Sequence, residues 1–285
     1  RRCDILQAMS HEFSRRTFFS AATAAAALPA FGAKKIPVGL ELYSVRTEMA
    51  KDVIASVKTC AKMGYPGFEF YGNYTEWTID FAKQVRKVLD DLNVKCYSTH
   101  NGANIFTPEG IGKAIEINTI LGSKYIVQAS AGRVTGLDGW KGVAEKLSQS
   151  YEKAKAAKLS VGYHNHAAEF KAVEGTRPLE VIAKGTPKEV MMQLDVGTCV
   201  EAGEDPVKWI QDNPGRIKCV HCKDYSKDKK YRVLFGEGDA PWKDIFKASE
   251  SKGGVEFYLI EQEGYDLPPF ETAEKCLANF KKIHG

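Results

Sequence analysis

The 285-residue sequence has almost no excess of either charge, no long apolar run and no break in composition along its main part. Its 40 basic residues stand against 36 acidic ones, so the net charge is only +4 and the clustered basic face that nucleic-acid binding needs is not expected. A content of 44% hydrophobic and 27% charged residues, with 25 Gly and 11 Pro, excludes a disordered chain, a collagen repeat and a coiled coil. What remains is a globular protein with one large domain or two small ones.

The first 33 residues differ from the rest of the chain. Arg15 and Arg16 precede an alanine-rich stretch that ends in small residues, which is the pattern of an export signal, and the paired arginines resemble the twin-arginine type. The stretch is too short and too rich in alanine to span a bilayer. We therefore expect residues 1–33 to be an upstream extension, with the natural start at Met9, followed by a twin-arginine signal peptide, and we expect a periplasmic protein.

Removal of residues 1–33 takes away four arginines and two acidic residues, which leaves 36 basic and 34 acidic residues and a net charge of +2. This near-neutral chain predicts neither a nucleic acid nor a membrane surface as partner, and a homo-oligomer stays open. Six cysteines remain, most of them inside apolar segments, where cysteine packs as a small core residue. We predict buried free thiols rather than disulfides.

From residue 36 onward, short β-rich apolar segments alternate with longer segments of helical period. The predicted strands are 38–43, 67–71, 94–99, 125–128, 160–164, 190–194, 217–221 and 257–261. The predicted helices are 51–63, 79–92, 110–121, 140–158, 179–183, 206–211, 242–251 and 270–283. Eight such units in about 250 residues are typical of a (β/α)₈ TIM barrel of the α/β class. A doubly wound open sheet is the alternative, but no glycine-rich phosphate loop follows the first strand. We predict one barrel over residues 34–285.

Polar residues gather at the carboxyl ends of the predicted strands, where the active site of such a barrel lies. Four of the five histidines after residue 33 are among them, although surface histidines would scatter over helices and loops. The strand-end residues are Glu41, Glu69, His100, His164, Asn165, His166, Asp195, His221, Lys223, Asp224, Glu261 and Glu263. This clustering is the strongest physical signal of a functional site in the sequence.

The ends of the last four strands predict a metal site. They carry His164, Asp195, His221 and Glu261. Parallel strands lie about 4.8 Å apart, so inward side chains on consecutive strands can converge on one ion. Two imidazoles and two carboxylates suit one divalent ion such as Zn²⁺, Mn²⁺, Co²⁺ or Fe²⁺ better than Ca²⁺, with Mg²⁺ also in range. Because His166 shares a strand face with His164, either histidine could be the ligand.

These strand-end segments resemble the sugar phosphate isomerase/epimerase family, the xylose isomerase-like TIM barrels. The resemblance rests on residues 161–166, 193–197 with 202–206, 220–224, 236–239 with Trp242, and 259–263, and the opening 39–46 looks like the first strand of that family. It implies one divalent metal at the ends of the last four strands. Carried over, the ligands are again His164, Asp195, His221 and Glu261.

A metal beside such groups suits proton abstraction next to a carbonyl, through an enediolate that the ion would stabilise. Glu261, Glu169 and His166 are the candidate bases, and Lys223 is a candidate to stabilise negative charge. His100, Glu69 and Trp242 are the predicted contacts to a small sugar or sugar derivative. We therefore expect a metal-dependent sugar isomerase or epimerase. A dehydratase or a 3-keto-glycoside lyase or hydrolase on the same site, and a non-catalytic sugar-binding barrel, are the alternatives.

Overall fold

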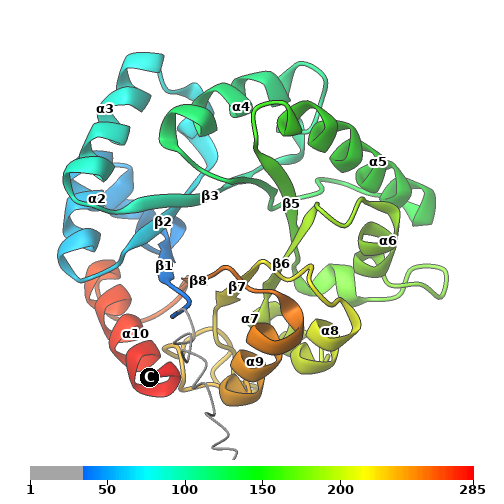
Figure 1. Cartoon of the computed structure of the whole chain (residues 1–285). Coiled ribbons are helices and arrows are strands. Elements are labelled where there is room, and N and C mark those ends of the chain that lie inside the picture. Colours follow the sequence, from blue (N-terminus) through cyan, green and yellow to red (C-terminus); the bar gives the residue numbers. More distant parts are fainter. Residues whose placement is uncertain (1–34) are drawn as a thin grey trace, which may run out of the picture. The chain divides into compact units, whose positions relative to one another are not determined.

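The computed structural model describes residues 35–285, and the predicted signal segment lies outside these described residues. Within them, eight parallel strands close into a barrel in chain order, each strand pairing with the next and β8 pairing with β1 (Figure 1). The strands are β1 (Val38–Glu41), β2 (Gly67–Tyr71), β3 (Lys95–Asn101), β4 (Tyr125–Gln128), β5 (Ser160–His164), β6 (Met191–Asp195), β7 (Cys219–Cys222) and β8 (Phe257–Ile260). The predicted (β/α)₈ barrel is confirmed.

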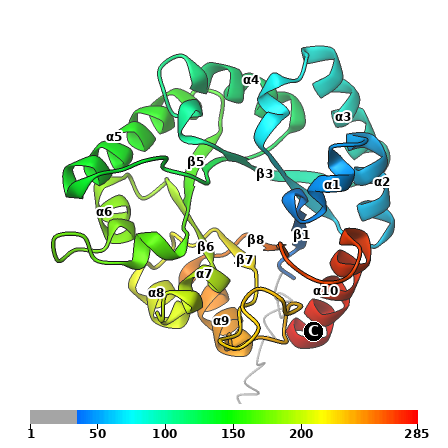
Figure 2. The same ribbon diagram turned by 180° about the vertical axis from the view of Figure 1, so that it is seen from behind.

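Helices surround the barrel and cover its outer face (Figure 1). They are α1 (Arg46–Met49), α2 (Val53–Lys62), α3 (Ile79–Asp91), α4 (Gly110–Leu121), α5 (Gly136–Lys155), α6 (Pro178–Gly185), α7 (Val196–Glu201), α8 (Pro206–Asp212), α9 (Trp242–Ala248) and α10 (Pro269–His284). Their ends follow local chemistry: Asp205 caps α8, whose first residue is Pro206, and Gly122 ends α4 at a φ of +71°. Figure 2 shows the opposite end of the barrel, with the short helix α1 in front of it.

The core has two parts. A large apolar cluster lies between the helices and the outer face of the strands, while a smaller one joins strand residues only: Tyr125, Val127, Met191, Cys219, Phe257 and Leu259, with Tyr97 against them. The smaller cluster fills the barrel interior, as the packed layers of such barrels do. Gly67 makes room for it, since a Cβ there would lie 2.4 Å from the Tyr97 ring.

The six described cysteines are buried and free, so the prediction of free thiols is confirmed. Among residues 35–285, no helix has the length and apolar character needed to cross a membrane.

A bulge in β3 shifts its register against β2. Phe68 pairs with Cys96 but Glu69 pairs with Ser98, so that Tyr97 is the extra residue. A bulge reverses the alternation of side chains beyond it. Because Tyr97 faces the interior cluster, an unbroken strand would also turn Thr99 inward. The bulge turns His100 inward instead, and Thr99 bonds Tyr74 and Asn118 on the helix side.

Candidate metal centre

The candidate site is a layer of buried polar side chains above the apolar layer of the barrel interior. Three of the strands that contribute to the apolar layer continue two residues later with a polar side chain on the same face, because the strand period is two. In this way Met191 is followed by Gln193, Cys219 by His221 and Leu259 by Glu261. The sequence thus places a layer of polar side chains on top of the apolar layer of the barrel interior. We call this buried polar layer the polar floor.

The structure brings the four predicted metal ligands together. His164, Asp195, His221 and Glu261 each offer one ligand atom, and these atoms lie within 4.8 Å of one another. His221 Nδ1 is 2.7 Å from Glu261 Oε2, and His164 Nε2 is 3.7 Å from Asp195 Oδ2. All four side chains are buried.

Asp195 is held so that one carboxylate oxygen is left for a ligand. It caps α7 and its Oδ1 accepts the Thr198 backbone N–H at 2.9 Å. Its buried Oδ2 has no hydrogen-bond partner. Lys223 Nζ at 3.6 Å and His164 Nε2 at 3.7 Å are near this oxygen but too far for a hydrogen bond, so it keeps the capacity to bind a cation. The donor set and this oxygen therefore fit a divalent cation held by the four residues.

A second group, Glu41, Glu69 and His100, adjoins the first and supports it. Glu69 Oε2 lies 2.9 Å from His221 Nε2 and 3.1 Å from His100 Nε2, while Glu69 Oε1 accepts from Gln193 Nε2 at 2.9 Å. These carboxylate oxygens orient the rings that enter the metal site. Glu41 Oε1 accepts the Tyr43 N–H, and its Oε2 is buried without a partner.

Sequence reasoning missed Gln193. Its Oε1 lies 3.1 Å from His164 Nδ1 and 2.6 Å from His100 Nε2, so one amide links both histidines to Glu69. The signal was available, since Gln193 stands two residues before Asp195 on β6 and shares its face.

Burial and close contacts shift the pKa values of the titratable groups in this site strongly. Burial alone would lower the pKa of His221, but hydrogen bonds to Glu261 and Glu69 outweigh it and raise this pKa to about 10. Burial alone would raise the pKa of Glu69, but His100 and His221 outweigh it and lower this pKa to about 2. Glu41 behaves in the opposite way: burial and the neighbouring Glu69 charge raise its pKa well above the usual range.

Lys223 is buried beside the candidate metal ligands rather than on the surface. Its Nζ is 3.6 Å from Asp195 Oδ2 and 3.5 Å from Glu261 Oε1, and it forms an ion pair with Glu263. Burial would lower the pKa of Lys223, but the charge of Glu261 and those of Asp195 and Glu263 outweigh it and raise this pKa well above the usual range. The lysine charge therefore offsets the carboxylates of the site.

A pocket of about 350 Å³ opens above this polar floor. It is lined by Glu41, Tyr43, Tyr71, Gly72, His100, Asn101, Gly102, Ala129, Ser130, His164, His166, Glu261 and Glu263. The exposed ring of His166 stands at its rim, 5.0 Å from the ring of buried His164. Among the two histidines considered for the metal, the one with its ligand atom inside the four-residue group is therefore His164.

The structure does not bring Glu169 or Trp242 into this pocket. Glu169 is buried behind the rim, where its Oε1 accepts the Tyr163 hydroxyl and its Oε2 accepts the His166 N–H. The Trp242 indole donates to Asp224 Oδ2 at 2.8 Å, and its ring packs on Phe235. Both residues stabilise loops, so the predictions of Glu169 as a base and of Trp242 as a substrate contact are corrected.

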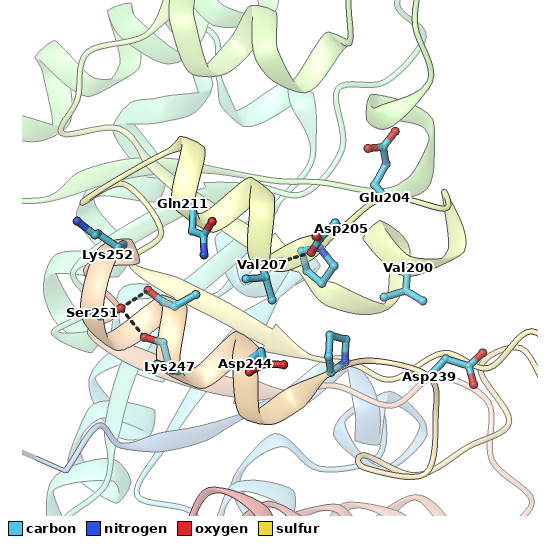
Figure 3. Close-up of a pocket in the computed structure, with 13 residues that line it drawn as sticks. Val200, Glu204, Asp205, Val207, Gln211, Asp239, Asp244, Lys247, Ser251 and Lys252 are labelled. Carbon is cyan, nitrogen blue, oxygen red and sulfur yellow. Dashed lines mark hydrogen bonds between the residues drawn. The ribbon is translucent and has the colours of Figure 1, made fainter.

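A separate hollow lies on the helical side of the molecule, between α8 and α9 (Figure 3). It has a volume of about 590 Å³ and is bordered by residues such as Asp205, Val207, Asp244 and Lys252. None of the strand-end histidines or carboxylates lines it, so this hollow is separate from the polar cluster at the barrel mouth.

Comparison with known proteins agrees with this architecture. The family model described as xylose isomerase-like TIM barrel matches residues 57–283. A solved sugar phosphate isomerase/epimerase from Parabacteroides distasonis is 29% identical, with a TM-score of 0.75, covering 88% of this chain and 96% of its own.

Two curated relatives are inosose dehydratases. That of Clostridium perfringens is 27% identical over 142 residues, 44% of this chain, and that of Lacticaseibacillus casei is 26% identical over 191 residues, 55% of this chain. The chain spans 47% and 63% of the lengths of these two relatives, respectively.

Proposed function

Because this chain belongs to the xylose isomerase-like TIM barrel family, we propose that it is a divalent-metal-dependent enzyme that removes a proton next to the carbonyl of a sugar or polyol. The observation that carries the proposal is the convergence of His164, Asp195, His221 and Glu261 beneath an open pocket. A divalent ion held there would supply Lewis acidity to a substrate carbonyl.

The residues of the chain divide the remaining work. His166 faces the pocket from the rim and stands outside the ligand group, so it is the proposed base for the substrate C–H proton. Lys223 holds Glu261 and Asp195 in place through their carboxylates. His100 presents its ring to the pocket with Nε2 bound to Gln193, which leaves Nδ1 for a substrate hydroxyl.

The fate of the carbanion distinguishes two candidate reactions. Return of the proton to either carbon completes an isomerisation or epimerisation, which is the function that the site supports first. Loss of a hydroxyl from the neighbouring carbon, which leaves as water after protonation, completes a dehydration. The inosose dehydratases among the relatives support this second candidate.

Solvent exchange tests the proposed step. The protein loaded with Mn²⁺ is incubated in heavy water with ketoses and inososes, and deuterium in recovered substrate and product is measured by NMR. We expect deuterium at the carbon next to the carbonyl, with an isomer or a dehydrated dicarbonyl as the product. If the protein holds the metal but exchanges no C–H proton in any of these compounds, the chain is a binding barrel instead.

Matched variants separate the base from the ligands. His166→Ala should keep the metal and lose at least 100-fold in exchange rate, which is within the range of general-base catalysis. Asp195→Ala and His221→Ala should lose the metal itself. Metal content is measured by elemental analysis after gel filtration, and full occupancy in both ligand variants would refute the proposed set.

A further inference from the structure

The pocket above the polar floor has acidic side chains in its wall and neither lysine nor arginine. Glu41, Glu261 and Glu263 line it, whereas none of its lining residues is Lys or Arg. We propose that the substrate is an uncharged polyhydroxylated ketone and that phosphate esters and sugar acids are rejected. This inference rests on the proposed function and specifies the substrate class of the same site.

Two cations lie close to the pocket wall, and both are bound elsewhere. Lys223 is buried, with Nζ shared among Asp195, Glu261 and Glu263. Arg46 stacks on the ring of Tyr43, 4.5 Å from the ring centroid, and donates to the backbone oxygens of Tyr43 and Glu263 at 3.1 and 3.3 Å. Neither lines the pocket, so a phosphate group would meet no basic side chain there.

A bound divalent ion would not make the net charge around the pocket positive. The two carboxylates in its ligand set, Asp195 and Glu261, match its two positive charges. Glu263, which lines the pocket, forms an ion pair with Lys223, so the Glu69 carboxylate of the polar floor supplies the remaining negative charge, and its burial limits screening by salt. A dianionic ester would therefore enter a field of its own sign, and the like charges would reject it.

The groups that do face the pocket suit a neutral sugar. Glutamate side-chain oxygens form hydrogen bonds with hydroxyls, and the Glu41 side chain that lines the pocket has an Oε2 without a hydrogen-bond partner. Tyr43 and Tyr71 meet edge to face with ring centroids 5.1 Å apart, and Tyr43 keeps 37% of its surface exposed. Such rings pack on the C–H face of a sugar ring. The volume of about 350 Å³ suits a monosaccharide-sized ligand.

Matched substrate pairs test the inference. The Mn²⁺-loaded full chain is assayed for deuterium exchange with neutral ketoses, inososes and 3-keto-glycosides, and with the phosphate ester of each. We expect exchange with a neutral member and at least a tenfold lower kcat/KM for its ester. A phosphate ester exchanged as fast as its neutral partner, or faster, overturns the substrate class and leaves the proposed function intact. Exchange with neither member of any pair overturns both.

A charge-removal variant tests the stated cause. Glu263→Gln removes one negative charge from the pocket wall and should narrow the preference for the neutral member at least threefold. Glu274→Gln removes an exposed glutamate of α10 outside the pocket and serves as the matched control, for which the preference should not change. If the two variants shift the preference equally, the pocket wall is not its source.

Discussion

Glu69 Oε2 accepts a hydrogen bond from His221 Nε2 at 2.9 Å, and this contact determines which ring nitrogen faces the metal ligands. Because Nε2 carries the donated proton, Nδ1 is left toward Glu261 and Asp195. The other histidine ligand is fixed in a parallel way: His164 Nδ1 lies against Gln193 Oε1, which leaves Nε2 toward Asp195. Gln193 in turn donates to Glu69, so one carboxylate anchors both rings.

This arrangement predicts that Glu69 controls metal affinity without being a ligand. Glu69→Gln should weaken Mn²⁺ binding about 10- to 100-fold, which is the usual cost of losing an outer partner of a ligating histidine. The dissociation constant is measured by competition with a chelator. Glu41→Gln is the control, since it changes a neighbouring buried carboxyl group that contacts neither histidine ligand. This variant should change the dissociation constant for Mn²⁺ by less than about threefold. Equal losses in the two variants would mean that any disturbance of the buried polar layer, rather than the loss of ring orientation, lowers the affinity.

The raised pKa of His221 predicts that metal binding releases a proton. In the metal-free protein this pKa is about 10, so the ring is protonated at neutral pH and must lose a proton before Nδ1 can bind an ion. Affinity should therefore rise with pH between about 7 and 9, by up to about tenfold per pH unit for one proton. Titration calorimetry in two buffers of different ionisation enthalpy measures the released protons. A heat that is the same in both buffers would contradict this protonation state.

The contact between Trp242 and Asp224 predicts a structural role for the tryptophan. Asp224 Oδ2 also accepts the backbone N–H groups of Gly236 and Gly238, so the indole completes the anchor of this loop. Trp242→Phe should lower the free energy of unfolding by about 1–3 kcal/mol, the usual cost of a lost hydrogen bond to a charged group. Urea denaturation measures this loss, and KM should stay unchanged. An altered KM with unchanged stability would restore Trp242 as a substrate contact.

The segment before the barrel supports a proposal about location. We propose that Arg15 and Arg16 direct the protein through the twin-arginine route to the periplasm. A chain with both arginines changed to lysine should stay in the cytoplasm, whereas the unchanged chain reaches the periplasmic fraction. Fractionation followed by immunoblotting measures the distribution, and an identical distribution of both chains would refute the proposal.

The alternation of apolar strands and helical segments was enough to predict the barrel, because each strand is short, β-rich and buried on both faces. The strand ends shifted by only one or two residues in most cases. Asp195 is the last residue of β6 rather than the first residue after it, and β3 continues to Asn101 because this residue pairs with Gln128 of β4. The short helix α7 was not predicted; it begins where Asp195 caps it directly at the strand end.

The sequence by itself determined the barrel and the composition of its polar floor, because a period of two carries polar side chains onto the face that the apolar residues before them occupy. Only the tertiary structure decided the rest. The bulge at Tyr97 turns His100 inward, and packing across the barrel joins Gln193 and Glu69 to both histidine ligands. Tertiary packing also holds Glu169 and Trp242 in loop contacts. These outcomes depend on contacts between residues far apart in the chain, which no local pattern encodes.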